Sequence, residues 1–228
     1  MVGGESAKIG SVPARLGFLH TSPVHVATFD AHVAEVDPSV LTVHAVDETL
    51  LETARRYGAN HESVVIAVAQ ALVDLARDGA NVIVCTCSTI GGTAESTVAS
   101  GVRVLRVDRP MAAAAVASAG RIAVVAAVES TLEPTVALLS DECVRQHRLP
   151  LIELRPCLDA WAFWEAGDVG GYYRSVADHV NSLDDSFDVV VLAQASMFGA
   201  LRLLDERPGR HVLSSPSSAV RAAIECIR

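Results

Sequence analysis

Aromatic residues are scarce in this sequence, and clusters of basic residues are missing. Only 4% of the 228 residues are aromatic, whereas 50% are hydrophobic. The core must therefore be aliphatic and rich in alanine, which suits helices packed closely on a parallel sheet. The formal net charge is −9, and this balance argues against nucleic acid or an anionic membrane as a partner.

The sequence also lacks the features of an exported or membrane-spanning chain. The residues from Met1 to Lys8 contain no apolar core like that of a signal peptide, and the longest apolar stretches are only strand-sized. The five cysteines are odd in number and show no paired ligand spacing. We therefore expect free thiols, no metal site, no membrane contact and a bacterial-type cytoplasmic location.

Strand-like and helix-like segments alternate along the chain. Helices are predicted over residues 29–36, 63–78, 111–119 and 172–183, with one more ending near 147. Strands are predicted over residues 15–20, 41–46, 81–87, 102–107, 121–126, 151–154, 188–193 and 211–214. Gly79 stands where a left-handed residue ends the 63–78 helix. The alternation is typical of right-handed parallel α/β sheets.

The second half of this pattern repeats the first at a spacing of about 106 or 107 residues. The predicted fold class is therefore α/β, with two pseudo-symmetric lobes that each contain a parallel sheet flanked by helices. We assign residues 1–111 together with 212–228 to the first lobe, and residues 112–211 to the second. The cleft between the strand ends of the two lobes is the predicted active site.

The most informative stretch runs from Asn81 to Gly92, where an apolar strand leads into a turn with a thiol, hydroxyls and two glycines. A thiol at a strand end, close to free backbone N–H groups and a helix start, can have a lowered pKa and act as a base or nucleophile. Cys87 holds that position, although a cysteine there can also be a small hydrophobic residue packed under the loop. Cys85 is expected in the core, and the remaining cysteines are expected to be structural.

Four motifs, spread over nearly the whole chain in the right order, resemble the aspartate/glutamate/hydantoin racemase superfamily. They are residues 16–21, 84–91, 121–126 followed by Ser130 and Thr131, and 191–197. The resemblance implies two α/β lobes that each offer one cysteine to opposite faces of a substrate's acidic carbon. It further implies a small carboxylate or amino-acid substrate, no cofactor, and a homo-oligomer of two or more copies.

Position by position, the resemblance also implies roles for individual residues. Cys87 matches the catalytic cysteine of the first lobe, and His20 falls where glutamate racemases place an acidic residue near that thiol. Ser88, Thr89, Ser130 and Thr131 match residues that contact the substrate carboxylate, and Thr21 matches a hydroxyl residue at the end of the first strand. By their chemistry, these hydroxyls and that of Ser22 can bind a carboxylate together with turn N–H groups. The alternative is that such residues only cap helices and turns, and Ser130 is expected to start a capping box.

Gln194 stands where the second cysteine should be, and Ser196 nearby supplies only a hydroxyl. An amide cannot exchange protons at neutral pH, so Gln194 can only orient a substrate by hydrogen bonds. The prediction is a racemase-type isomerase that uses Cys87 as its acid/base. A one-thiol decarboxylase, a cis–trans isomerase and a non-catalytic carboxylate-binding protein remain alternatives. The tryptophans Trp161 and Trp164 would either cover the cleft or, as we favour, fill an interface.

Overall fold

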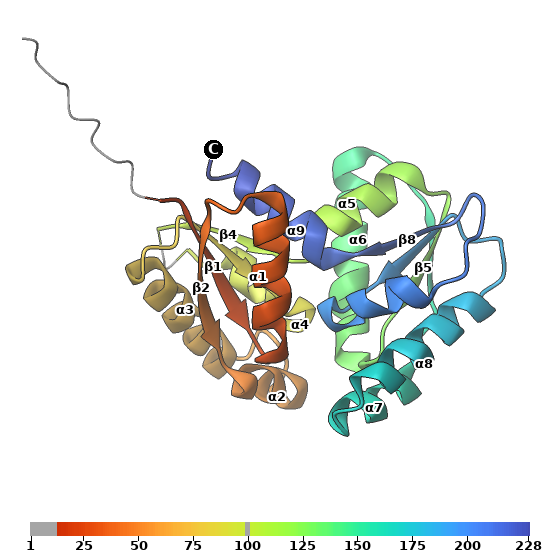
Figure 1. Cartoon of the computed structure of the whole chain (residues 1–228), viewed down its shortest axis with the longest axis horizontal. Helices are drawn as coiled ribbons and strands as arrows, with labels where there is room; N and C mark the ends of the chain where they lie inside the picture. Colours follow the sequence, from red (N-terminus) through yellow and green to blue (C-terminus); the bar gives the residue numbers. More distant parts are fainter. Residues whose placement is uncertain (1–12, 99–100) are drawn as a thin grey trace, which may run out of the picture.

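The protein folds into two lobes, each built on a four-stranded parallel sheet (Figure 1). The computed structural model describes residues 13–98 and 101–228, so the N-terminal segment considered above lies outside the described residues. The first sheet has the order β2 (Leu41–Val46), β1 (Arg15–His20), β3 (Val82–Cys85) and β4 (Arg103–Arg106). The second has the order β6 (Leu151–Leu154), β5 (Arg121–Val125), β7 (Val189–Leu192) and β8 (His211–Ser214). The predicted fold class is confirmed, and so is the repeat.

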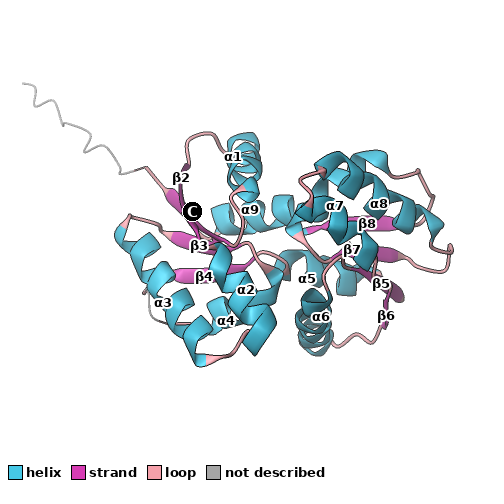
Figure 2. Cartoon of the chain, turned by 90° about the horizontal axis from the view of Figure 1, so that it is seen from below, coloured by secondary structure: helices cyan, strands magenta, loops and turns pink. Residues whose placement is uncertain are grey.

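Helices cover both faces of each sheet (Figure 2). In the first lobe, one face is packed by α1 (Val24–Val36) and α9 (Ser215–Glu225), and the other by α2 (Glu48–Tyr57), α3 (Glu62–Arg77) and α4 (Ser88–Ser96). In the second lobe, α5 (Arg109–Ser118) and α6 (Leu132–Gln146) pack on one face; the 3-10 helix η1 (Glu129–Thr131) precedes α6. The other face carries the 3-10 helices η2 (Leu158–Ala160) and η3 (Ala195–Leu203), with α7 (Trp161–Glu165) and α8 (Val169–Ser182).

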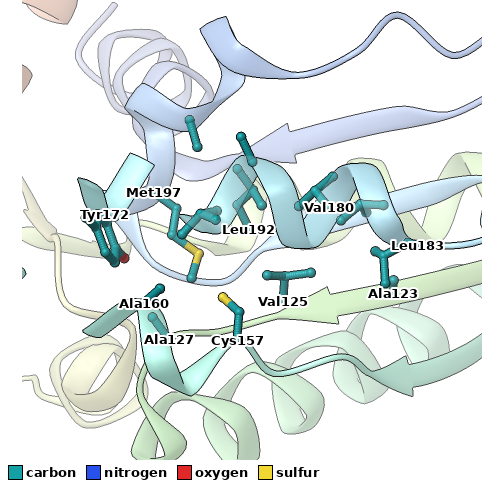
Figure 3. Packing of buried hydrophobic residues seen from close by; sticks show 14 of the residues in the cluster. Ala123, Val125, Ala127, Cys157, Ala160, Tyr172, Val180, Leu183, Leu192 and Met197 are labelled. Atoms are coloured by element: carbon teal, nitrogen blue, oxygen red, sulfur yellow. The ribbon is translucent and has the colours of Figure 1, made fainter. Parts of the chain in front are cut away.

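The core is mainly aliphatic, as the scarcity of aromatic residues predicts, although Phe18, Phe29 and Tyr172 are also fully buried. In the second lobe, small residues such as Ala123 and Val125 on β5 allow α8 to approach the sheet, and Met197 fills the space beside Leu192 (Figure 3). Full burial of a Val, Leu or Met side chain contributes about 1.5–3 kcal/mol to the stability of the fold. Aliphatic packing on both faces is what keeps the strand ends in place.

Strand β1 is central in the first sheet and approaches its neighbours closely at Gly17. A Cβ atom added at this residue would lie 2.8 Å from the Cβ of Ala80 and 3.1 Å from Cγ1 of Ile83. Glycine is required here because no side chain fits between the strand and the start of β3. The register that follows pairs Leu19 with Cys85, so the polar ends of the two strands leave the sheet side by side.

The C-terminal segment passes from one lobe to the other. Strand β8 pairs with β7 in the second sheet, whereas α9 packs against α1 and the core of the first lobe. Figure 1 shows α9 reaching across to the first lobe, where the chain ends. The lobe boundaries given above stay a prediction.

Two local predictions are wrong, while Gly79 is confirmed with a φ of 89°. The capping box at Ser130 does not form: the residue lies in η1, and its buried hydroxyl has no hydrogen-bond partner among the described residues. Gly91 is not in a turn but inside α4, where it passes close to the side chain of Arg106. Among the described residues, no helix is both long and apolar enough to cross a membrane.

Candidate active site

A cavity of about 540 Å³ lies between the lobes at the carboxyl ends of their strands. Its walls contain most of the residues that the sequence selects as site candidates. These are Thr21, Ser22, Cys87, Ser88, Thr89, Thr131, Gln194 and Ser196. His20 and Ser130 are not part of the lining; Ser130 lies instead in a neighbouring open depression beside α6.

Cys87 is the residue that joins β3 to α4. It is the N-cap of α4, with an extended backbone and no side-chain capping bond, and it is partly exposed. The first backbone N–H groups of a helix lack internal partners and favour negative charge, so a thiolate or a carboxylate is stabilised there. Cys85 is fully buried two residues earlier, and burial raises the pKa of its thiol. Of the two neighbouring thiols, only Cys87 reaches the cavity.

Gln194 follows β7 as Cys87 follows β3, and its side chain is held firmly. Its Oε1 accepts hydrogen bonds from the backbone N–H groups of Ala127 (2.6 Å) and Val128 (3.1 Å). Because both partners are donors, the oxygen and nitrogen of the amide are assigned without ambiguity. The Nε2 group has no partner among the described residues, and it is free to donate to a ligand.

Two of the candidate serines already make hydrogen bonds within the protein. Ser88 Oγ donates to the backbone oxygen of Ala193, 2.9 Å away in the other lobe. Ser196 Oγ shares a 2.9 Å hydrogen bond with the hydroxyl of Tyr172, a buried residue whose pKa is raised by that burial. The Ser88 hydroxyl can still accept one hydrogen bond from a ligand, but its proton is used in the hydrogen bond between the lobes.

His20 is fully buried behind the cavity wall. Its Nδ1 lies 2.8 Å from Oγ1 of Thr86, and its Nε2 lies 2.9 Å from Nδ1 of His44. The chain continues from His44 Nε2 to Oδ1 of Asp30 at 3.0 Å. Burial, with the neighbouring His44 and His25, lowers the pKa of His20 to about 3. Since both ring nitrogens are occupied, His20 reaches the cavity only through Thr86.

Sequence reasoning missed several residues of the cavity. His25, in the first turn of α1, lines the wall, and burial lowers its pKa to about 4. The ring of His25 stacks on that of Trp164 from the other lobe, with centroids 6.2 Å apart. Trp161 and Trp164 both line the cavity as well. The tryptophans therefore lie at the interface between the lobes, as favoured above, and they line the cavity as well.

Helix α2 adds a stripe of residues to the cavity wall. Glu48, Leu51, Glu52 and Arg55 are spaced at i, i+3, i+4 and i+7, and all four line the cavity. This spacing puts them on one face of a helix that starts just after β2. The same spacing is visible in the sequence and could have identified these residues as part of the cavity wall. Arg55 forms no ion pair within the part of the chain that the structure describes, so its charge is available to an anion.

The arrangement offers chemistry on one face of a ligand. One thiol at a helix N-terminus can take or give a proton, while hydroxyls, Gln194 Nε2 and Arg55 can hold a carboxylate. No group of three or more His, Cys, Asp or Glu side chains within residues 13–98 and 101–228 is arranged to hold a metal ion.

Comparison with solved structures shows which fold this is. Aspartate racemase from Picrophilus torridus superposes with a TM-score of 0.72 at 16% identity, over 93% of each chain. Glutamate racemase from Thermus thermophilus, in complex with β-chloro-D-alanine, has a TM-score of 0.59 at 18% identity, over 93% of this chain and 80% of that one. The chain therefore shares its two-lobed fold with these aspartate and glutamate racemases.

The same fold occurs in a decarboxylase. A liganded mutant of arylmalonate decarboxylase, in which a glycine is changed to cysteine and a cysteine to serine, has a TM-score of 0.62 at 14% identity, over 94% of this chain and 92% of that one. No model of a known protein family matches the sequence, and no curated protein sequence matches it either.

Proposed function

We propose that this protein is a cofactor-independent enzyme that acts at the α-carbon of a small carboxylate or amino acid, with Cys87 as its acid/base. The observation that carries the proposal is the position of this thiol. It is partly exposed at the N-terminus of α4, in a cavity shared by both lobes of a racemase-type fold.

The rest of the cavity supports a bound carboxylate. Arg55, which forms no ion pair with the described residues, supplies a positive charge, and the N–H groups at the start of α4 supply donors. Such donors stabilise the negative charge that spreads onto a carboxylate when a proton leaves the adjacent carbon. The volume of about 540 Å³ suits a small molecule.

Gln194 favours a second candidate function, a one-thiol decarboxylase. Proton exchange on both faces of a carbon needs an acid/base on each side, and the amide opposite Cys87 provides none. Decarboxylation needs only one proton, delivered to one face of the resulting carbanion. Arylmalonate decarboxylase, a structural neighbour, is an example of this reaction class on the same fold.

Exchange of the α-proton in heavy water tests these functions. A panel of amino acids and substituted malonates is incubated with the wild type, Cys87→Ala and Cys87→Ser, and is followed by proton NMR and chiral chromatography. We expect exchange or carbon dioxide release with the wild type, and a loss of about 1,000-fold or more in both variants, as for removal of an essential acid/base. Thermal stabilisation by a carboxylate without any turnover would instead identify a binding protein.

A further inference from the structure

The hydrogen-bond chain behind the cavity has a fixed direction. Its members are Thr86, His20, His44 and Asp30, and Thr42 Oγ1 donates to the same Asp30 oxygen at 2.7 Å. The Asp30 carboxylate can only accept, so the hydrogen between it and His44 lies on Nε2 of the imidazole. Nδ1 of a neutral His44 is then an acceptor, and it must receive the Nε2 hydrogen of His20.

The direction of the next hydrogen bond, between His20 and Thr86 at the cavity wall, follows in the same way. Neutral His20, with its hydrogen on Nε2, has a bare Nδ1, so the hydroxyl of Thr86 must donate to it. The other acceptor near this hydroxyl is the backbone oxygen of Leu19, which is farther away at 3.1 Å and already accepts the N–H of Thr86. With a neutral His44, the reversed direction would place its bare Nε2 against a carboxylate oxygen, with two acceptors facing each other.

Packing keeps this hydrogen-bond chain rigid and keeps His20 neutral. His20 is fully buried, and the ring of Phe18 stacks on both His20 and His44 with interplanar angles near 15° (15° and 14°). A positive charge on His20 is disfavoured by burial, which lowers its pKa. His20 therefore does not hold an extra proton, and the effect of the hydrogen-bond chain is to orient the hydroxyl of Thr86 at the cavity wall.

We infer that Thr86 is a specificity-determining residue that accepts a hydrogen bond from an N–H group of the substrate. Its proton is committed to His20, so the lone pairs of its oxygen are what it can offer to a ligand at the cavity wall. An α-amino carboxylate supplies such a donor, whereas a simple carboxylate or a malonate does not. This inference rests on the proposed function and narrows its substrate class to α-amino carboxylates.

Imidazole tautomers provide a direct test that needs no ligand. In ¹⁵N NMR spectra at about pH 8, above the ordinary His pKa, we expect His20 and His44 both to carry hydrogen on Nε2 and none on Nδ1. In Asp30→Asn, the new amide can donate as well as accept, so this preference is lost. A wild-type His20 protonated at Nδ1 would overturn the inference. The exposed carboxylate variant Asp78→Asn serves as the matched control and keeps the wild-type tautomers.

Matched ligand pairs test the consequence by calorimetry. Aspartate is compared with succinate, and phenylalanine with 3-phenylpropanoate. A hydrogen bond to a charged donor contributes enough to predict a preference of about tenfold or more for the amino compound. Thr86→Ser keeps this preference, while Thr86→Val and Asp30→Asn reduce it to about threefold or less. The affinities of the two ligands of a pair are compared within the same variant. A general loss of stability weakens both ligands alike and therefore leaves their affinity ratio unchanged.

The outcomes separate this inference from the proposed function. Equal binding of both members of a pair to the wild type, or an unchanged ratio in Thr86→Val, overturns the role of Thr86 but leaves the carboxylate site standing. Failure of every carboxylate to bind overturns the proposed function, and the substrate-class inference falls with it.

Discussion

The Cys87 thiol is distinguished from the other thiols of the chain by its surroundings. Cys85, Cys143 and Cys157 are buried, and burial raises the pKa of each of them. Cys226 is partly exposed but follows the last residue of α9, away from the cavity lining. Reactivity toward electrophiles follows thiolate content and access.

Alkylation of the native protein at neutral pH should therefore be selective. We expect iodoacetamide to modify Cys87 and Cys226 and to leave the three buried cysteines intact, as read by peptide mass mapping. A bound carboxylate should slow the modification of Cys87 alone, with Cys226 as the internal control. Labelling of Cys85 at the rate of Cys87 would contradict this picture of the site.

The side-chain amide of Gln194 has two ends with different roles: Oε1 binds the backbone, and Nε2, which has no partner in the described part of the chain, is free to bind a ligand. Substitutions can separate these two roles. In Gln194→Glu, one carboxylate oxygen keeps both backbone hydrogen bonds, while the other places a negative charge where Nε2 was. We expect an unchanged or higher melting temperature but a carboxylate affinity about tenfold or more weaker, because like charges meet.

The matched variant Gln194→Ala should lose stability without adding a negative charge to the cavity. It leaves the N–H groups of Ala127 and Val128 without their acceptor, at a cost of about 1–3 kcal/mol in the free energy of unfolding. Calorimetry and thermal melting separate the two variants. Equal carboxylate binding by wild type and Gln194→Glu would show that this amide does not face the ligand.

At the scale of elements, Arg109 connects the two lobes. It starts α5 and binds Glu95 of α4 at 2.7 Å, together with Asp141 at 2.6 Å and Glu142 at 2.7 Å on α6. The side chain of Glu142 is only 7% exposed, so removing its cation leaves a nearly buried charge without its main partner. Breaking such a pair is costly even where the pair itself adds little net stability.

We expect Arg109→Met to lower the free energy of unfolding by about 2–4 kcal/mol. The control is Arg145→Met, which removes a mostly exposed arginine bound to the same carboxylates and should cost less than about 1 kcal/mol. Urea unfolding with an unchanged m-value measures both. Equal effects of the two variants would show that Arg109 is not the link between α4 and α6.

The same arginine gives this stability a pH dependence. Its hydrogen bond lowers the pKa of Asp141, so the contribution is present above the ordinary Asp value and is lost as pH falls through the lowered one. Arg109→Met should therefore flatten the loss of stability below about pH 4.

The elements themselves were largely predictable, because a hydrophobic run that ends in polar residues marks a strand of a parallel sheet. The run before Cys87 and the run before Gln194 gave both lobes and the position of the candidate site. Helix starts were less predictable. Ser130 has the sequence of a capping box, but the tight turn of η1 forms instead and leaves the hydroxyl without a hydrogen-bond partner in residues 13–98 and 101–228.

At the scale of the whole molecule, the cavity depends on segments that no local pattern connects. His25 and Trp164 are far apart in the sequence and meet only because α1 and α7 face each other across the lobes. Thr86 gains its role from Asp30 and His44 on other elements. Motif matching finds residues that follow a strand, whereas pairings of this kind depend on how the lobes pack.

The histidines buried near the cavity make the stability of the whole molecule sensitive to mild acid. Burial lowers the pKa of His20 to about 3 and that of His25 to about 4. Between these values and the ordinary His pKa of about 6.5, the unfolded chain binds protons that the folded protein does not. The contribution is therefore complete above about pH 6.5 and is lost as pH falls toward 4, by at most about 1.4 kcal/mol per pH unit for each ring.

Urea unfolding at a series of pH values measures this loss directly. His25→Asn should reduce the slope between about pH 6.5 and 4, whereas His211→Asn, which changes an exposed histidine at the start of β8, should leave it unchanged. This window lies above the one assigned to Asp141, so the two effects can be told apart in one experiment. A flat stability across it would mean that His20 and His25 are already charged in the folded protein. In this pH window a charged His20 would donate to Thr86, so the direction deduced for the Thr86 hydrogen-bond chain would then hold only above about pH 6.5.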